Sequence, residues 1–264
     1  MHVNDEDLAG IPPYYQHGGV TIYLGDCLEV MPHLSKVDLV LTDPPYGTTD
    51  CKWDTAIPLD KMWAALKGIT HDKTPIVLCC GEPFTSVLVV SNLKQFKYRW
   101  VWEKNLKTGP YLAKQQPMLG HEDIAVFYKS LPAYNPQKRA RTSETKNGNK
   151  RNSKTSVYGG AWKEKYTDQQ SNLIHPDTVL RDIKCVHSSS GRVHPTQKPV
   201  ALMEYMIKTY TNPGDTVLDF AMGSGTTLVA ARNLGRKAIG IEFEEKYCAI
   251  AVDRLKQGAL LQCS

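Results

Sequence analysis

The chain of 264 residues predicts an α/β fold built on a mostly parallel β-sheet. Strand-like runs alternate with helix-like segments along the sequence. Residues 37–42 and 215–220 lack the polar alternation of a half-exposed strand, which is typical of strands covered by helices on both faces. Loops rich in functional groups follow both runs directly, and ligands of parallel sheets bind where strands end. We therefore expect the functional site at the carboxyl ends of these two strands.

The hydrophobic pattern of the first half predicts five strands and two helices. The helix at residues 59–67 places Met62, Trp63 and Leu66 on one side, and Gly68 follows as its expected end. The expected strands are residues 20–24, 37–42, 75–80, 97–102 and 122–128, and the second helix lies near residues 84–93.

The last third of the chain predicts a further alternation of helices and strands. An amphipathic helix at residues 200–210 is followed by a turn at Asn212-Pro213-Gly214. The expected elements after it are a strand at 215–220, a helix at 226–234 ended by Gly235, a strand at 237–242 and a helix at 244–257.

Residues 130–170 differ in composition from the rest of the chain. They contain almost no aliphatic residues and many Lys, Arg, Asn, Ser and Thr, so they cannot bury much surface. We expect a mobile segment, or one that folds on binding, with regular structure resuming near residue 194.

The positive charge is concentrated in the middle of the chain. The net charge is +5, but residues 94–170 hold 16 Lys and Arg against 6 Asp and Glu, and the remainder is net acidic. A basic middle third on an acidic body indicates a nucleic-acid partner. A solvated, passive charged loop explains the same pattern and remains open.

The cysteines and the hydropathy favour a cytosolic protein. The seven cysteines are odd in number and form no C-x-x-C pair, so neither a disulfide framework nor a metal site is expected. No run reaches about 18 apolar residues, which predicts no membrane span. The acidic, polar N-terminus resembles neither a secretory signal nor a transit peptide.

The first motif is Thr42-Asp43-Pro44-Pro45-Tyr46-Gly47. Two prolines stiffen the loop and remove two backbone donors, which leaves a carboxylate, the free Pro44 carbonyl and an aromatic ring. These groups suit a planar base that bears an amino group, because the oxygens accept the amino hydrogens and the ring stacks on the base. A proline turn with a surface-packed tyrosine is the structural alternative.

The second motif, residues 220–227 (FAMGSGTT), joins a strand to a helix. Gly223 and Gly225 permit close approach of a ligand to the backbone, and the helix N-terminus offers free N–H groups. The next strand ends in Glu242, near the spacing at which an acid binds ribose hydroxyls in nucleotide sites. No lysine follows the glycines, so a P-loop is excluded. The alternative is a tight turn without a ligand.

The third motif is His194-Pro195-Thr196-Gln197-Lys198-Pro199, which precedes the amphipathic helix. Two prolines again stiffen a polar loop. Taken alone, the motif is most typical of a helix start that Thr196 or Gln197 caps.

Together, DPPY, a basic segment, HPTQKP and FAMGSGTT in this order resemble the β-group of S-adenosylmethionine-dependent DNA amino-methyltransferases. The resemblance covers residues 20–129 and 190–257. Its clearest segments are GDCLEVMPHL and VDLVLTDPPYGT, HPTQKPVALMEYMI, and PGDTVLDFAMGSGTTLVAA with LGRKAIGIE. Phe220 follows Asp219 directly where the family commonly has DPFxGSG, which we expect to shorten the strand end by one residue. The catalytic motif precedes the cofactor motif, which points to DNA enzymes.

The resemblance implies a Rossmann-like seven-stranded methyltransferase sheet, mostly parallel with an antiparallel edge strand, plus a basic target-recognition insertion. It divides the chain into a catalytic half (1–129), the insertion (130–190) and a cofactor-binding half (191–264). It implies S-adenosylmethionine as cofactor, with Glu242 on the ribose, Asp26 near the adenine ring, and Thr196 and Lys198 near the methionine part. The implied cofactor residues are Asp26, Cys27, Thr196, Lys198, Asp219, Phe220, Gly223, Ser224, Gly225, Thr226, Thr227 and Glu242.

The implied activity is methyl transfer to the exocyclic N6 of an adenine flipped out of double-stranded DNA. The implied catalytic residues are those of the DPPY motif, Asp43, Pro44, Pro45 and Tyr46. Adenine is the implied base because DPPY is the form usual for adenine N6 transfer. The alternatives are N4-cytosine transfer, an RNA methyltransferase and an inactive DNA-binding module. A homodimer, a cognate restriction endonuclease and a bacterial or phage-encoded cytoplasmic origin are further expectations.

The insertion is expected to contact DNA through its cations, mainly at phosphates. The expected contacts are Lys138, Arg139, Arg141, Lys146, Lys150, Arg151 and Lys154. Tyr158, Trp162 or Tyr166 are candidates to stack on a base or, alternatively, to form a small local core.

Overall fold

The computed structural model describes residues 11–47, 56–140, 173–186 and 197–260, with side chains up to residue 257. The chain divides into two compact units, one formed by residues 136–177 and the other by the remainder. Among the described residues, no helix is long and apolar enough to cross a membrane.

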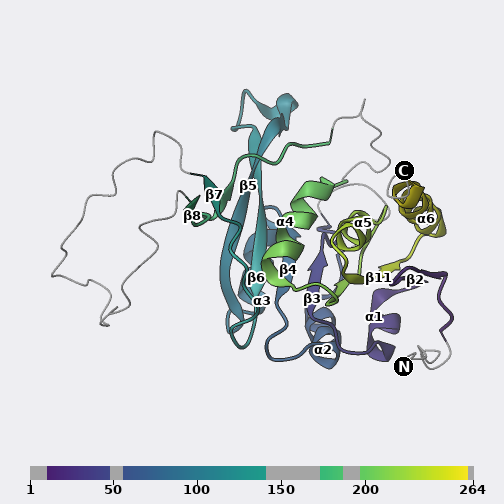
Figure 1. Ribbon diagram of the computed structural model, residues 1–264. Coiled ribbons are helices and arrows are strands. Elements are labelled where there is room, and N and C mark those ends of the chain that lie inside the picture. The colour runs from purple at the N-terminus through teal and green to yellow at the C-terminus, as the bar shows by residue number, and fades with distance from the viewer. Residues whose placement is uncertain (1–10, 48–55, 141–172, 187–196, 261–264) are drawn as a thin grey trace. The chain divides into compact units, whose positions relative to one another are not determined.

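The larger unit is built on one mixed sheet, which has nine strands among the described residues (Figure 1). Their order across the sheet is β1-β2-β11-β10-β3-β4-β6-β5-β9. The strands are β1 (Tyr15–His17), β2 (Val20–Leu24), β3 (Leu39–Thr42), β4 (Ile76–Cys80), β5 (Phe96–Thr108), β6 (Leu119–Phe127), β9 (Val179–Leu180), β10 (Thr216–Asp219) and β11 (Lys237–Glu242).

The strands from β2 to β4 are parallel, which confirms the predicted mostly parallel α/β sheet. Two short strands, β1 and β9, extend the expected seven at the two edges. β1 is an antiparallel edge strand, and β6 runs antiparallel to both of its neighbours, β4 and β5. The carboxyl ends of β2, β11, β10 and β3 therefore meet at one edge of the sheet.

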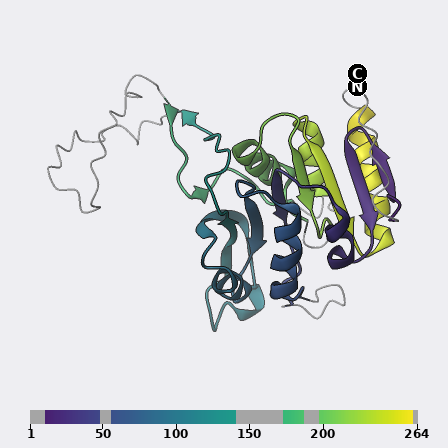
Figure 2. The same cartoon turned by 90° about the horizontal axis from the view of Figure 1, so that it is seen from below.

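Helices cover both faces of the sheet (Figures 1 and 2). One hydrophobic cluster packs one face against three helices, and a second cluster packs the opposite face against the other three. The first set is α4 (Val200–Tyr210), α5 (Thr226–Asn233) and α6 (Glu245–Leu260); the second is α1 (Cys27–Val30), α2 (Leu59–Ile69) and α3 (Phe84–Ser91).

The central strands show why both faces are covered. Leu39 and Leu41 of β3 belong to one cluster, whereas Val40 between them belongs to the other. All three side chains are fully buried, because successive residues of a strand point to opposite faces. A strand of this kind must be apolar throughout, which explains the unbroken run in the sequence.

Most predicted elements occur within one to three residues of their expected bounds. α2 continues through Gly68 to Ile69, so this glycine does not end the helix as predicted. β5 is far longer than the expected strand at 97–102, because it continues into a hairpin with β6. β10 ends at Asp219, one residue before the expected end.

The smaller unit contains a two-stranded antiparallel ladder of β7 (Arg139–Ala140) and β8 (Leu173–Ile174). Arg139 forms an ion pair of 3.4 Å with Asp177, and both side chains are about half exposed. Hydrogen bonds fix the two residues of the larger unit that flank it. Asn135 donates its backbone N–H to the Thr209 carbonyl, and the Thr178 carbonyl accepts the Val101 N–H of β5.

Candidate active site

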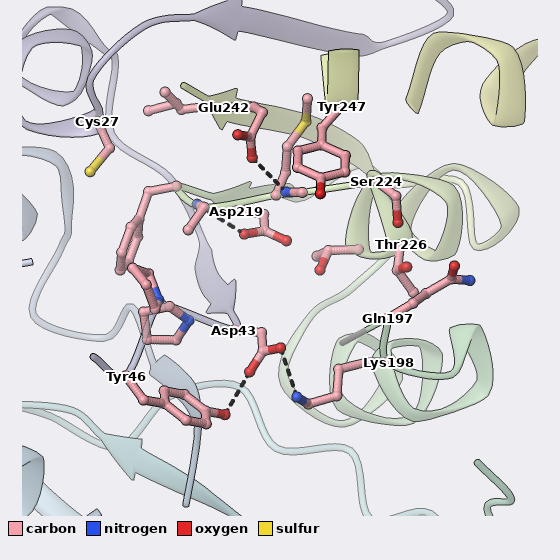
Figure 3. Close-up of a pocket in the computed structure, with 18 of the residues that line it drawn as sticks. Cys27, Asp43, Tyr46, Gln197, Lys198, Asp219, Ser224, Thr226, Glu242 and Tyr247 are labelled. Carbon is pink, nitrogen blue, oxygen red and sulfur yellow. Dashed lines mark hydrogen bonds and ion pairs between the residues drawn. The ribbon is translucent and has the colours of Figure 1, made fainter. Parts of the chain in front are cut away.

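A cavity of about 1060 Å³ opens at the carboxyl ends of β2, β3, β10 and β11 (Figure 3). The loop after each of these strands contributes to the lining, and β5, β6 and the start of α4 close the other side. The loops are Gly25–Leu28 after β2, Asp43–Tyr46 after β3, Phe220–Ser224 after β10 and Phe243–Glu244 after β11. The cavity thus lies at the strand ends where the sequence predicts a functional site, and it gathers two motifs that are far apart in the chain.

A buried hydrogen bond joins the two motifs. Thr42 Oγ1 donates to Asp219 Oδ1 at 2.5 Å, which links the last residue of β3 to the last residue of β10. Burial raises the pKa of Asp219 to about 6, although hydrogen bonds from Thr227 and Thr42 oppose the shift. Asp219 therefore holds the ends of the two strands together at the floor of the site.

The Asp43 carboxylate has a partner on each oxygen (Figure 3). Tyr46 Oη donates to Oδ1 at 2.6 Å, and Lys198 Nζ donates to Oδ2 at 2.7 Å. Only 21% of the Asp43 side chain is exposed, and it lines the cavity. Asp43 is thus a hydrogen-bond acceptor held in a fixed orientation.

Lys198 belongs to a buried chain of alternating charges. Its Nζ lies 3.1 Å from Glu122 Oε2, and Glu122 Oε1 accepts a hydrogen bond of 2.9 Å from Lys104 Nζ. Burial opposes the charge of Glu122, yet Lys198 and Lys104 outweigh it and lower the pKa of this carboxyl. Burial likewise opposes the charge of Lys198, but Asp43 and Glu122 raise its pKa well above the usual value. The two central groups, Glu122 and Lys198, are therefore ionised at neutral pH.

Tyr46 is packed from behind by a second ring. Phe84, the first residue of α3, stacks on it with ring centroids 5.1 Å apart and an interplanar angle of 17°. Burial and the Asp43 carboxylate raise the pKa of the Tyr46 hydroxyl, which therefore remains a donor. Phe84 thus covers one face of the ring, and Lys198 Nζ lies over the ring 6.0 Å from its centroid.

The glycine loop adopts a conformation that favours glycine. Gly223 has φ +51° and Gly225 has φ +75°, both in the left-handed region. A Cβ on Gly223 would meet no atom within 4 Å, whereas one on Gly225 would lie 2.7 Å from the Ala251 Cβ of α6. Gly223 therefore faces open space at the cavity, and Gly225 permits close packing of α6. DFAMG and DPFxG have the same number of residues between Asp and Gly, so the departure at Phe220 is a substitution and shortens nothing.

Arg254 of α6 supports the same loop from outside. Its guanidinium donates to the Ser224 carbonyl and to the hydroxyls of Ser224 and Thr226. Burial lowers the pKa of Arg254 from its usual value. The loop is thus held by a cation that the sequence patterns did not identify.

Glu242 closes the glycine loop from the neighbouring strand. Its Oε2 accepts the Gly223 N–H at 2.9 Å, and its Oε1 accepts the Glu244 N–H at 2.9 Å. Burial raises the pKa of Glu242, and the N–H groups of Glu244 and Gly223 oppose that shift. Each oxygen retains lone-pair capacity, so this oriented carboxylate can accept hydroxyl hydrogens from a ligand in the cavity.

Asp26 and Cys27 form the wall after β2. Asp26 caps α1 by accepting the Leu28 N–H at 2.8 Å. Burial and the nearby Asp26 raise the pKa of the Cys27 thiol to about 12, so this thiol is protonated. Asp26 therefore has the structural role of a cap in addition to lining the cavity.

Most of the predicted site residues lie together around the cavity. The lining contains Asp26, Cys27, Asp43, Pro44, Pro45, Tyr46, Lys198, Asp219, Phe220, Gly223, Ser224, Thr226, Thr227 and Glu242. Gly225 lies beneath it against α6, and Thr196 falls outside the described residues. Lys138 and Arg139 belong to the smaller unit. Arg141, Lys146, Lys150, Arg151 and Lys154, with Tyr158, Trp162 and Tyr166, also fall outside the described residues.

Several lining residues were not predicted from the sequence. They include Lys104, Glu122 and Trp102 from β5 and β6, and Tyr247 from α6. Glu122 and Lys104 are 18 residues apart and meet only through the register of the hairpin. The available signal was Glu122 at the start of the predicted strand at 122–128; Lys104 lies beyond the predicted strand at 97–102. Across the described residues, no group of three or more His, Cys, Asp or Glu side chains is placed to hold a metal ion.

Comparisons with known proteins agree with this arrangement. The chain is 30% identical over 241 residues to the methylase YubD of Escherichia coli (strain K12), which covers 88% of each chain. It is 24% identical over 289 residues to the type II methyltransferase M2.LlaDCHI of Lactococcus lactis subsp. cremoris, with 98% of each chain covered. The crystal structure of the M1.HpyAVI–SAM complex matches it with a TM-score of 0.60 and 28% identity, over 89% of this chain and 98% of that one. The DNA methylase family that includes N6 and N4 enzymes matches residues 37–253. The chain therefore belongs to the N6/N4 family of DNA methylases.

Proposed function

We propose that the chain transfers a methyl group from S-adenosylmethionine to the exocyclic N6 of an adenine that has been flipped out of double-stranded DNA. The observation that carries this proposal is the shared cavity. The oriented Asp43 carboxylate and the glycine loop at Gly223 line one space, although 180 positions separate them in the chain. Such a space accommodates an acceptor base and a methyl donor side by side.

The residues around the glycine loop fit a nucleoside-type methyl donor. Gly223 leaves open space at the position where any other residue would carry a Cβ, and Glu242 presents oriented carboxylate oxygens beside it. Glu242 and Asp26 would hold the nucleoside part, and residues Gly223–Thr227 would approach the rest. M1.HpyAVI, a structural relative, was crystallised with this donor. When bound, S-adenosylmethionine supplies a methyl group activated by a positively charged sulfur.

Asp43 and Pro44 would act on the amino group of the target base. That group is a poor nucleophile, because its lone pair is delocalised into the ring. Accepting its two hydrogens at Asp43 and at the Pro44 carbonyl shifts charge onto nitrogen and aligns the lone pair. Catalysis is then chiefly a matter of position and electrostatics. A carboxylate accepts about four hydrogen bonds, so Asp43 can receive the base while it retains Tyr46 and Lys198.

Tyr46 would stack on the base within the cavity. A base inside a duplex cannot reach Asp43, and flipping it out costs a few kcal/mol. Stacking on an aromatic ring contributes about 1–3 kcal/mol and offsets part of that cost. Phe84 fixes the ring from behind, so the base finds a prepared surface rather than a mobile side chain.

The choice of adenine follows from the Asp at the first position of DPPY. The family includes both N6 and N4 enzymes, so N4 of cytosine is the second candidate. Both reactions use an exocyclic amino group and the same acceptor oxygens. Only the identity of the methylated base in the product therefore distinguishes them.

The test is methylation of unmethylated genomic DNA by purified protein with labelled S-adenosylmethionine. Wild-type protein should label DNA, and sequencing of the product should show N6-methyladenine within one short sequence. Asp43→Ala should abolish labelling but retain affinity for S-adenosylmethionine. Asp72→Asn is the control, because Asp72 is exposed and pairs only with Lys129 among the described ion pairs.

Three results would contradict the proposal. Labelling of RNA but not DNA would indicate an RNA enzyme, N4-methylcytosine in the product would indicate the second candidate, and an active Asp43→Ala protein would exclude this catalytic role.

We further propose that residues 130–190 form the target-recognition element, with the cations from Lys138 to Lys154 on phosphates. A homodimer and a partner endonuclease remain predictions. Sedimentation of the purified protein tests the first, and a search of the neighbouring coding sequences for an endonuclease tests the second.

A further inference from the structure

The β5–β6 hairpin carries an exposed apolar tip. Every residue from Asn105 to Leu119 is exposed, although five of them are large hydrophobic residues. Tyr111 is 97% exposed and Leu119 is 58% exposed. The other members are Leu106, Leu112 and Met118. Exposed apolar residues gathered on one projection indicate a contact surface.

The charge of this tip suits a polyanion. Residues 104–121 contain Lys104, Lys107, Lys114 and His121, but no Asp or Glu. Lys114 is exposed at the tip, whereas Lys107 Nζ donates to the Lys104 carbonyl at 3.0 Å. A surface that combines lysines with an exposed aromatic ring matches nucleic acid, since the lysines meet phosphates and the ring meets a base.

The tip lies next to the cavity in the fold. Leu106 and Thr108 of β5 line the cavity, and Tyr111 follows three residues after Thr108. Figure 1 shows the hairpin, in teal, projecting past the neighbouring strands of the sheet. Because Leu106 and Thr108 share one cavity with Asp43, the hairpin tip continues from the wall of the space that would receive the base.

The backbone of the tip is shaped to present Tyr111. Gly109 has φ +83°, and Pro110 then starts the short 3-10 helix η2 (Pro110–Leu112), which holds the tyrosine in its centre. A left-handed glycine followed by proline gives a stiff turn with few alternative conformations. A ring on a stiff projection loses little entropy when it binds.

We propose that residues 105–119 form a DNA-binding finger that enters the duplex beside the target base, with Tyr111 stacking in the gap that the flipped base leaves. Lys114 contacts a phosphate at the same place. This inference rests on the proposed DNA methylation. It places the stacking residue in the larger unit rather than among the aromatic residues of the insertion.

The test compares Tyr111→Ala with wild type on two synthetic duplexes. The first contains the methylation sequence fully paired, and the second has the target base mispaired and therefore easier to flip. On the paired duplex, kcat/KM should fall about tenfold, and on the mispaired duplex most of the loss should disappear. Tyr111→Phe should keep most of the activity, because its ring still stacks.

Two controls show whether the loss of activity is specific to the finger. Leu131→Ala removes another exposed hydrophobic side chain, one that does not line the cavity, and should leave kcat/KM unchanged. Affinity for S-adenosylmethionine should be the same in all variants. Fluorescence of 2-aminopurine placed at the target position should rise with wild type and less with Tyr111→Ala.

Several outcomes would overturn the inference. These are unchanged activity of Tyr111→Ala on the paired duplex, an equal loss on both duplexes, or a loss that accompanies conversion of a dimer to a monomer in sedimentation. The last would show that the tip contacts a second copy of the chain. Absence of DNA methylation by the wild type is a separate result, since it refutes the proposed function and the finger with it.

Discussion

At the scale of single residues, the main finding is that the acceptor carboxylate is held between two donors. Asp43 accepts a hydrogen bond from Tyr46 on one carboxylate oxygen and from Lys198 on the other. The sequence suggested Lys198 for the methionine part of the donor, a role that stays a prediction. Its contacts with Asp43 and Glu122 indicate in addition that it orients the Asp43 carboxylate.

Lys198→Met should therefore impair the methyl-transfer step and shift its pH dependence. Lys198 and Lys104 together lower the pKa of Glu122 against the effect of burial, so without Lys198 this pKa should rise. We expect kcat to fall about tenfold at pH 7 and the acid limb of the kcat–pH profile to move to higher pH. Single-turnover rates between pH 5 and 9 measure both effects.

Two matched variants accompany this measurement. Lys198→Arg keeps the charge and should keep the position of the acid limb. Lys208→Met removes an exposed lysine paired with Glu204 and should change neither quantity. An unchanged profile for Lys198→Met would show that the lysine has only a structural role.

Asp219→Asn should change how stability depends on pH. Burial raises the pKa of Asp219 from 3.8 to about 6, so the folded state binds a proton more tightly than the unfolded state. This carboxyl therefore costs stability as the pH rises from about 4 to 6, and the cost is complete above pH 6.

The difference in unfolding free energy, variant minus wild type, should accordingly grow between pH 4 and pH 7. The expected increase is on the order of 3 kcal/mol. Urea titrations at four pH values measure it. A constant difference would mean that Asp219 has an ordinary pKa in the folded protein.

At the scale of elements, the buried strands and long helices were predictable, because their hydrophobic periods are local properties. β3, β10 and β11 lie within two residues of their predicted bounds for this reason. β1, α1 and β9 were not predicted, since elements of two to four residues carry too short a pattern. The row of ion-paired side chains Lys104, Glu122 and Lys198 depends on strand register, which no local sequence pattern reveals.

The glycine loop allows an element-scale test with a matched pair. Gly225→Ala places a Cβ 2.7 Å from Ala251 at φ +75°, so α6 must move. Gly223→Ala meets no atom within 4 Å and carries only the left-handed strain, which is about 1–2 kcal/mol. We expect Gly225→Ala to lower the unfolding free energy by at least 1 kcal/mol more than Gly223→Ala.

Binding should separate the two variants in a complementary way. Gly223→Ala should weaken S-adenosylmethionine affinity despite its milder effect on folding, because Gly223 lines the cavity and a Cβ there would take up open space. Urea unfolding and calorimetric titration measure the two quantities. Equal unfolding free energies of the two variants would show that α6 shifts to accommodate the added Cβ without loss of stability.

At the scale of the whole molecule, charge and architecture coincide. Residues 136–177 hold nine Lys and Arg against four Asp and Glu, so the net charge of +5 resides in the smaller unit. The larger unit is balanced. The sequence predicted a basic middle third on an acidic body, whereas with the bounds of the structural units the larger unit is neutral rather than acidic.

Neutralising cations of the smaller unit should lower DNA affinity and make that affinity less dependent on salt concentration. The double variant Lys138→Gln and Arg139→Gln should lower DNA affinity, and the slope of log affinity against log salt should become shallower by about 1–2. Fluorescence anisotropy at several salt concentrations measures the slope. The same slope as the wild type would mean that these residues make no phosphate contacts.

The control neutralises two exposed lysines of the larger unit, Lys237 and Lys256. This double variant loses the same formal charge, so it separates local contacts from the overall charge. We expect its slope to match the wild type.

The hydrogen bonds at Asn135 and Thr178 have a consequence for how such enzymes diversify. Both flanks are fixed to the larger unit, Asn135 at the end of α4 and Thr178 on β5. The closure entropy of a segment between fixed ends depends only weakly on its length. Residues 136–177 should therefore tolerate exchange or a change of length without rebuilding the cavity. Under the target-recognition role proposed for this segment, such an exchange would change the DNA preference.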